Sequence, residues 1–417
     1  MNCRRVIRLS GLLVLSVALT ALVNAQSPLC FAFGANTPGH TLVAPDTSYT
    51  AERGYGFEPS ATLTGGKQIT SVQPFYFSVA VPEGNYRVTA TLDGATTVKA
   101  ELRRLMVLGE ARTAGRWVTR QFIVNVRRPQ ISTSGAGNLE VKLKDRERTS
   151  EWWAWDEKLT LEFNGAHPAL RMLAIERADV PTVYLLGDST VCDQGREPYN
   201  SWGQMLTRFF DARIAIANHA ESGESLKSSL GTRRLDKVLS LVKPGDYLLL
   251  QFGHNDEKEK GGGAFTTYKA DLKKYVTAAR ARGVNVVLLT PMHRRTFDAA
   301  GKITNSHGDY PAAVRQVAAE ENVPLIDLFA LSQILYETLG SDKSGALFKE
   351  GDATHHSNYG SYELARCVVA GIKQNKLALQ TYLLKNVPAF DPRRPDDSTR
   401  LALPPSPLQS NVKPLGN

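Results

Sequence analysis

Hydrophobic and polar positions along the chain follow different rules before and after Pro181. Before it, short segments alternate between apolar and polar residues and are divided by turn residues, which is typical of half-buried antiparallel strands. After it, apolar runs of strand length alternate with segments of helical periodicity, the pattern of βαβ units. The sequence therefore predicts an N-terminal β-sandwich followed by an α/β domain with a doubly wound parallel sheet.

The first of these regions has the spacing of strands and turns that is typical of a β-sandwich. Its expected strands are Phe75–Val81, Tyr86–Leu92, Arg120–Val126, Leu139–Leu143, Leu159–Phe163 and Leu170–Ile175. This spacing of strands and turns, together with the sequence Pro-Glu-Gly-Asn-Tyr-Arg-Val at residues 82–88, resembles that of the galactose-binding-like sandwiches that precede carbohydrate-active enzymes. Trp152, Trp153 and Trp155 lie just before one strand. We expect them to pack in the core, and stacking against sugar rings is the alternative.

The second region alternates strands and helices. Its expected strands are Thr182–Gly187, Ala212–Ala217, Tyr247–Gly253, Val284–Thr290 and Val323–Leu328. Its expected helices are Trp202–Phe210, Leu235–Val242, Phe265–Arg282, Tyr310–Glu320, Leu331–Leu339 and Tyr359–Gln374. Right-handed connections between five parallel strands give a flavodoxin-like sheet, with helices on both faces.

These patterns divide the 417 residues into four parts. We expect a signal peptide at residues 1–25, a carbohydrate-binding-like sandwich at 26–179, an α/β catalytic domain at 180–385 and a proline-rich tail at 386–417. A short polar hinge, Glu176 to Pro181, joins the two domains. The composition of the tail favours a loose segment over an ordered strap.

The first residues have the three parts of an export signal. Arg4, Arg5 and Arg8 precede an apolar stretch from Leu12 to Val23, and small residues ending at Ala25 mark the cleavage site. A retained signal anchor is the alternative. We expect a secreted or periplasmic protein that has no membrane association after cleavage, because no later apolar run is long enough to span a bilayer.

Charge and cysteine content refine this picture. Net charge is +9, and removal of a signal with three arginines and no acid leaves +6. The basic residues are dispersed, so a nucleic acid partner is not expected, whereas an acidic polysaccharide would be attracted. Three cysteines remain, an odd number; Cys192 and Cys367 either pair or are lone buried thiols. Oligomeric state is left open.

Candidate chemistry begins where the first parallel strand ends, at Gly187-Asp-Ser189. A small residue before a serine lets the backbone turn sharply and present the hydroxyl at the edge of the sheet where α/β proteins bind ligands. So short a motif is weak evidence, and a helix N-cap is the alternative role of Ser189. Three further polar stretches fall at the same edge, at residues 218–225, 253–256 and 351–356.

Together these stretches contain the parts that acyl transfer requires: a nucleophile, a base, a group that orients the base and donors for the oxyanion. Ser189 is the candidate nucleophile, His355 the base and Asp352 the orienting acid. The backbone N–H groups of Ser189 and Gly223 and the side-chain amide of Asn255 are the candidate oxyanion donors. His356 is an alternative base, but its one-residue offset points it the other way.

These blocks, in this order, resemble the SGNH (GDSL) hydrolase family over roughly residues 182 to 376, and most closely its rhamnogalacturonan acetylesterase branch. By this resemblance the family's nucleophile is Ser189, its acid is Asp352 and its base is His355. Its oxyanion donors are Ser189, Gly223 and Asn255. One departure is visible. Many members have an arginine directly after the glycine that corresponds to Gly223, whereas this chain has Glu224 there. This difference leaves the identity of the substrate open.

Other residues at this edge are candidates for substrate binding. They are His254, His293, Arg294 and Arg295. The histidines are as suited to packing as to substrate contact, and the arginines suit either a uronic acid carboxylate or a surface ion pair. No phosphate-binding glycine loop and no metal-ligand spacing is present, so we expect neither cofactor nor metal.

The resemblance implies an exported carbohydrate esterase that removes O-acetyl groups from a plant cell-wall polysaccharide, with pectic rhamnogalacturonan favoured. Acetylated polysaccharide or oligosaccharide would be its partner. Another acetylated glycan such as xylan is an alternative substrate. A non-catalytic carbohydrate-binding protein and an esterase for lipids or peptidoglycan are alternative functions.

Overall fold

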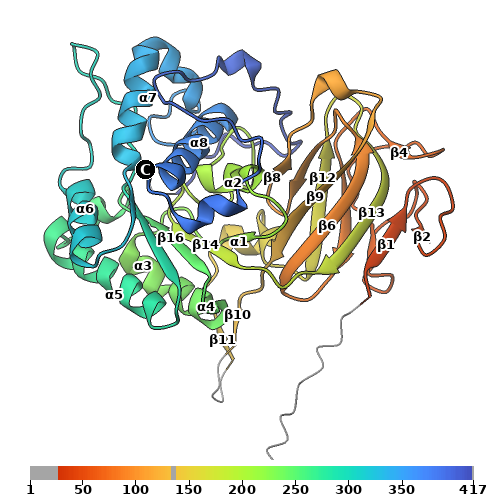
Figure 1. The fold of residues 1–417 in the computed structure, drawn as a ribbon, viewed down its shortest axis with the longest axis horizontal. Coiled ribbons are helices and arrows are strands. Elements are labelled where there is room, and N and C mark those ends of the chain that lie inside the picture. The colour runs from red at the N-terminus through yellow and green to blue at the C-terminus, as the bar shows by residue number, and fades with distance from the viewer. Residues whose placement is uncertain (1–26, 133–137, 416–417) are drawn as a thin grey trace, which may run out of the picture.

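The computed structural model describes residues 27–132 and 138–415, which form two domains joined side by side (Figure 1). The expected signal peptide lies outside these residues. Within them, no helix has the length and apolar character needed to cross a membrane.

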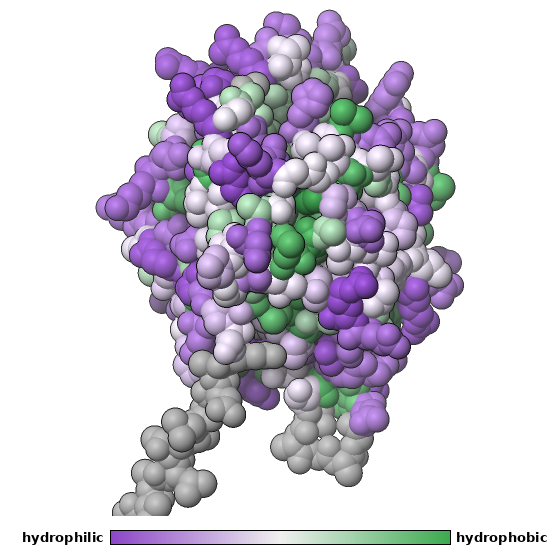
Figure 2. Space-filling view, turned by 90° about the vertical axis from the view of Figure 1, so that its right-hand side faces the viewer, coloured by the Kyte–Doolittle hydropathy of each residue, from purple (hydrophilic) through white to green (hydrophobic). Residues whose placement is uncertain are grey.

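The N-terminal domain consists of two largely antiparallel sheets packed face to face. One sheet has the order β2 (Thr41–Leu42), β1 (Leu29–Ala32), β13 (Ala169–Arg177), β6 (Gly84–Asp93) and β9 (Trp117–Val126), with β4 (Ile69–Thr70) paired to β13. The other has the order β3 (Tyr55–Phe57), β5 (Phe75–Ala80), β12 (Lys158–Asn164), β7 (Thr97–Ala100) and β8 (Arg104–Val107). Apolar side chains from both sheets form one core, as the alternation of apolar and polar residues predicts. The face turned away from the second domain is mainly polar, with apolar residues in small groups (Figure 2).

One expected strand of this domain is wrong. In place of a strand over residues 139–143, a two-residue strand, β11 (Leu139–Glu140), pairs with β10 (Gln130–Ile131) outside both sheets. The chain then turns toward the second domain, where the Lys142 backbone N–H donates to the carbonyl of Thr232. It continues into a short helix, α1 (Asp145–Arg148). Of the three tryptophans, Trp155 is buried, Trp153 is partly buried and Trp152 is exposed.

The second domain is built on a parallel sheet with the order β15-β14-β16-β17-β18. Its strands are β14 (Thr182–Gly187), β15 (Ala215–Asn218), β16 (Tyr247–Gln251), β17 (Asn285–Leu289) and β18 (Leu325–Ile326). In chain order this is 2-1-3-4-5, which confirms the flavodoxin-like arrangement. The chain reverses direction across the sheet between β14 and β16, and ligands bind at such a switch point.

Helices cover both faces of this sheet. One face packs against α2 (Trp202–Leu206), α7 (Leu328–Lys343) and α8 (Asn358–Gln374). The other packs against α3 (Leu226–Gly231), α4 (Arg234–Leu241), α5 (Lys269–Arg280) and α6 (Tyr310–Glu320). Successive residues of β14 enter opposite cores, Leu185 the first and Leu186 the second. This explains why the strand is an uninterrupted apolar run.

The contact between the domains is extensive and carries buried charges. The Arg104 Nε of β8 lies 3.4 Å from the Asp193 Oδ2 that follows β14. Arg234 of α4 forms a 2.6 Å ion pair with Glu147 of α1, and all four of these side chains are almost fully buried. Leu105 of β8 packs in the core of the α/β domain. A buried charge that loses its partner is strongly destabilising, so the two domains stabilise one another.

The C-terminal segment is an ordered strap rather than the loose tail that its composition favours. Ser406, which is 1% exposed, accepts a 2.7 Å hydrogen bond from Lys99 of β7 and contacts Glu162 of β12 at 2.8 Å. Its backbone N–H donates to Glu197 of the α/β domain at 2.9 Å. The strap, which we define as residues 386–415, therefore ties both domains together (Figure 1).

Candidate active site

The candidate nucleophile lies at a sharp turn that only glycine permits. A Cβ at Gly187 would come within 2.5 Å of both the Gln251 carbonyl oxygen and the Val191 side chain, so the last residue of β14 has no room for a side chain. The chain can then turn at once, and Ser189 lies at the carboxyl edge of the sheet. The sequence pattern thus predicts this local structure correctly.

Ser189, His355 and Asp352 form a continuous chain of hydrogen bonds. The Ser189 hydroxyl donates to His355 Nε2 across 3.0 Å, and His355 Nδ1–H donates to Asp352 Oδ2 across 2.9 Å. This assignment of donors fixes one neutral tautomer of the imidazole, the one that can take the serine proton. The structure therefore brings together three residues that are as far as 166 positions apart in the chain.

Asp352 is held as an anion by its surroundings. Burial acts to raise its pKa, but the bonds from His355 and from the Thr354 backbone keep the pKa well below its usual range. The alternative base, His356, points into the protein, where its Nε2 lies 3.0 Å from the Tyr336 hydroxyl. Burial lowers the pKa of His356 to about 3. This geometry favours His355 as the base.

Asp188, the residue before the nucleophile, stabilises the turn. Its Oδ1 accepts from the Thr190 backbone N–H at 2.9 Å and from the Thr190 hydroxyl at 2.7 Å, and its Oδ2 lies 3.1 Å from His254 Nδ1. Burial alone would raise the pKa of Asp188, yet the His254 ring and the Thr190 donors lower it to about 2. His254 is thus bound to the protein at the base of the site.

The expected oxyanion donors come from three loops at the same edge. Gly223 adopts the left-handed conformation, with φ of 75°, which glycine tolerates best. Among the described residues, the N–H groups of Ser189 and Gly223 have no hydrogen-bond partner. The Asn255 amide donates to the Glu224 carbonyl at 2.9 Å, which ties the loop after β16 to the loop of Gly223.

Asp256 also connects the loop after β16 to the segment that follows Gly223. Its Oδ1 accepts from the Leu226 backbone N–H at 2.8 Å, at the start of α3, while its Oδ2 is buried without a partner. Burial, with a contribution from Asp188, raises the pKa of Asp256 to about 8. At neutral pH this side chain is therefore a protonated acid.

The other candidate substrate-binding residues are engaged by the protein itself. The His293 ring is buried and lies over Phe329, with 3.6 Å between ring centroids. Arg294 pairs with Glu257 and donates to the His254 carbonyl at 3.1 Å. Arg295 donates to Ser344 and to the Ser341 carbonyl. Their role in substrate binding stays a prediction.

The structure also places residues beside the triad that the sequence does not suggest. Tyr199 packs edge-on against His355, with ring centroids 5.9 Å apart, and Lys413 Nζ of the strap lies 3.7 Å from Asp352 Oδ2. Lys144 and Arg146 reach the site from the N-terminal domain. Proximity to the serine in sequence is a usable signal for Tyr199, but no local pattern identifies the other three.

Glu224, the departure from the family pattern, is fully buried and paired. Its Oε1 lies 3.1 Å from Lys144 Nζ and 3.5 Å from Arg234 Nε. Lys144 in turn comes within 3.5 Å of the position that a Cβ would take at Gly223. A positive charge therefore does stand beside the oxyanion loop, although it comes from the other domain.

Comparisons with known proteins identify a family and several relatives of this chain. A model of the GDSL-like lipase/acylhydrolase family matches residues 185–360. The rhamnogalacturonan acetylesterase RhgT of Bacillus subtilis is 37% identical over 217 residues, which are 48% of this chain and 94% of that protein. The uncharacterized esterase YxiM of the same bacterium is 28% identical over 381 residues, 85% of this chain and 94% of that protein.

A crystal structure of the YxiM protein of Bacillus subtilis aligns with a TM-score of 0.48 and 26% identity, over 84% of this chain and 99% of that one. The family assignment rests on the sequence relative RhgT, almost all of which this chain covers. The chain belongs to the GDSL-like lipase/acylhydrolase family and is a hydrolase of carboxylic esters.

Proposed function

We propose that this protein is an exported esterase that removes O-acetyl groups from an acetylated plant cell-wall polysaccharide, with pectic rhamnogalacturonan as the first candidate. The observation that carries the chemistry is the hydrogen-bonded chain from Ser189 through His355 to Asp352. The choice of glycan is supported by the similarity to RhgT, which is named a rhamnogalacturonan acetylesterase. Acetylated xylan is the alternative substrate.

The reaction follows from the positions of these groups. Ser189 Oγ attacks the acetyl carbonyl while His355 Nε2 takes its proton, and Asp352 stabilises the imidazolium. The negative charge on the carbonyl oxygen is met by the N–H groups of Ser189 and Gly223 and by the Asn255 amide. His355 returns the proton to the departing sugar oxygen, which leaves an acetyl-enzyme. Water activated by the same histidine then releases acetate.

Export is part of the proposal because of the arginine-led apolar segment at residues 1–25. A secreted or periplasmic location would bring the enzyme to an extracellular polymer. N-terminal sequencing of the protein recovered outside the cytoplasm tests this, and we expect the mature chain to begin at Gln26.

Acetate release from a panel of acetylated substrates tests the activity. The panel contains acetylated rhamnogalacturonan, acetylated xylan and a small chromogenic acetyl ester, with Ser189→Ala as the control. We expect the alanine variant to lose a factor of about 10³ to 10⁶ in turnover while remaining folded. A variant that retains a tenth of the activity would show that Ser189 is not the nucleophile.

A lipid esterase is the second candidate that the panel addresses, through long-chain esters. The residues around the triad do not favour it, because Lys144, Arg146 and Lys413 bring charges to the site. An acyl chain is bound by apolar surface, and burial of charged groups against it is costly.

A further inference from the structure

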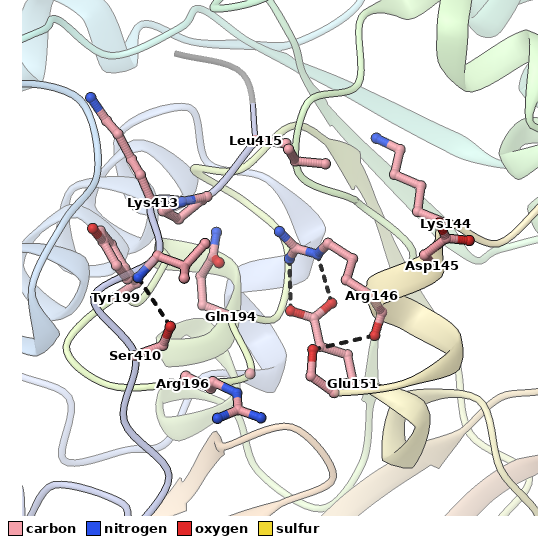
Figure 3. A pocket seen from close by; sticks show the side chains of 14 residues that line it. Lys144, Asp145, Arg146, Glu151, Gln194, Arg196, Tyr199, Ser410, Lys413 and Leu415 are labelled. Atoms are coloured by element: carbon pink, nitrogen blue, oxygen red, sulfur yellow. Dashed lines mark hydrogen bonds and ion pairs between the residues drawn. The ribbon is translucent and has the colours of Figure 1, made fainter.

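Lys144 connects the N-terminal domain to the loop that carries Gly223. It is the N-cap residue of α1 and one of the residues that line a pocket of about 780 Å³ between the two domains (Figure 3). The side chain is 24% exposed, and its Nζ donates to the Ser222 carbonyl and lies 3.1 Å from Glu224 Oε1. The ammonium of Lys144 is therefore bound to the residues on both sides of Gly223.

Gly223 lies in a β-turn formed by residues 221–224. The Glu224 N–H donates to the Glu221 carbonyl at 3.3 Å, which closes the turn. Gly223, the third residue, has a φ of 75°, and Ser222, the second, is not among the described residues with positive φ. This combination defines a type II turn.

The type of turn decides the direction of the Gly223 N–H. Types I and II differ by a flip of the peptide between the second and third residues, which here is the Ser222–Gly223 peptide. This peptide is trans and planar, so its C=O and its N–H point in opposite directions. A donor bound to the Ser222 carbonyl therefore also fixes the direction of the Gly223 N–H.

Lys144 is held in place as that donor. Within residues 27–132 and 138–415, no other group donates to the Ser222 carbonyl. The carboxylate of Glu224 is fully buried and pairs with Lys144 and, at 3.5 Å, with Arg234 Nε. Departure of the ammonium into solvent would leave this buried carboxylate with one partner fewer, which is costly.

The same bond strengthens the Gly223 N–H as a donor. A hydrogen bond from a cation is stronger than one between neutral groups, and hydrogen bonds in a chain polarise one another. The ammonium, the Ser222 C=O and the Gly223 N–H form such a chain, and its far end, the N–H, has no partner in the part of the molecule that the structure describes. An oxyanion at that N–H would complete the chain.

We propose that Lys144 is a positioning residue for ester hydrolysis, which holds the Ser222–Gly223 peptide in the orientation that presents the Gly223 N–H to the oxyanion and strengthens that donor. The inference rests on the mechanism given under the proposed function, in which Gly223 is an oxyanion donor, but it does not depend on the identity of the glycan. It gives the N-terminal domain a part in catalysis, although the whole triad lies in the other domain.

Kinetics on a small chromogenic acetyl ester test the proposal with Lys144→Met, which keeps the apolar stem of the side chain and removes the ammonium. Loss of a whole oxyanion donor costs about 10² to 10³ in turnover. We expect a smaller loss, about 10- to 100-fold in kcat with KM changed less than about twofold, because the glycine at position 223 still favours the type II turn. The matched control is Lys142→Met, which removes an exposed lysine two positions away and should leave kcat at the wild-type value.

A double variant separates positioning from stability. Lys144→Met leaves Glu224 with one partner fewer, so the melting temperature should fall. Addition of Glu224→Gln removes the buried charge, while Arg234 retains its pair with Glu147. The melting temperature should then recover and kcat should stay low, because the Ser222 carbonyl still lacks its donor. Recovery of kcat together with the melting temperature would overturn the inference, since Lys144 would then act only by neutralising Glu224.

Inhibition by a trifluoromethyl ketone gives a readout of the oxyanion itself. Ser189 Oγ adds to the ketone carbon, its proton passes to His355, and the adduct carries an oxyanion where the tetrahedral intermediate has one. The inhibition constant should therefore rise in Lys144→Met by the factor by which kcat/KM falls.

A wild-type kcat in Lys144→Met, or a lowered kcat with an unchanged inhibition constant, would overturn the inference and leave the esterase function standing, provided that Ser189→Ala is inactive. Retained activity of Ser189→Ala would instead overturn the proposed mechanism and this inference with it.

Discussion

Replacement of Asp256 by asparagine should stabilise the folded protein at alkaline pH. The pKa of this buried carboxyl is about 8, against an ordinary value of 3.8, so the shift is about four pH units. Each unit corresponds to about 1.4 kcal/mol, and ionisation of Asp256 therefore costs the folded state about 6 kcal/mol more than the unfolded state. Asparagine keeps the oxygen that accepts from Leu226 but has no charge to gain.

The direction of the pH effect follows from the raised pKa. The folded state binds the Asp256 proton more tightly than the unfolded state does. The contribution of this proton to the unfolding free energy is complete below about pH 4, decreases as the pH rises toward 8 and is constant above pH 8. Between pH 5 and 8 the wild type should lose about 4 kcal/mol of unfolding free energy relative to Asp256→Asn. At pH 5, about one unit above the ordinary pKa of 3.8, the wild type should already be about 2 kcal/mol less stable than Asp256→Asn.

Urea denaturation followed by tryptophan fluorescence at pH 5, 6.5 and 8 measures this difference. The same substitution at Asp46, an exposed residue of the N-terminal domain, controls for the loss of one carboxyl group. Parallel pH profiles for the wild type and Asp256→Asn would refute the reasoning, because they would mean that the Asp256 carboxyl ionises in the folded protein as readily as in water.

Four further changes test the site and the contact between the domains. Asn255→Ala should lower kcat about 10²- to 10³-fold with little change in KM, since the amide acts mainly on the developing oxyanion; a loss confined to KM would make it a substrate-binding residue. Asp352→Asn should lower kcat about 10⁴-fold, by analogy with other Ser-His-Asp enzymes, with the melting temperature nearly retained. Ser406→Ala should cost about 2 to 4 kcal/mol in urea denaturation, because buried groups of Lys99 and Glu162 each lose a bond. A chain that begins at Asp179 should be recovered as aggregate, since it exposes the partners of the interdomain ion pairs; a soluble, active product would show that the domains are independent.

The α/β sheet and the triad were predictable because their signals are local. The strands of the sheet are apolar runs, and Ser189 directly follows one at its carboxyl end, so the strand order and the position of Ser189 follow from general rules of the fold. Asp352 and His355 come after the helix that follows the last strand, and they were predictable from the sequence motif that they form rather than from a preceding strand.

The contact between the domains was not predictable in the same way. Arg103 and Arg104 are buried where β8 begins, yet an arginine pair in a sequence is typical of a surface loop, and its partners Glu197 and Asp193 lie about ninety positions away. The proline-rich strap likewise has no apolar periodicity, because polar bonds such as those of Ser406 hold it in place. Long-range polar pairing leaves no trace in the local pattern of a single sequence.

The position of Ser406 also bears on the order in which the molecule is completed. A polypeptide is synthesised from its N-terminus, and domains fold largely as units in that order. Lys99, Glu162 and Glu197 have therefore all been made long before the residue that bridges them. The bonds by which Ser406 joins the two domains can therefore form only after the strands and helices that supply its partners have all been synthesised.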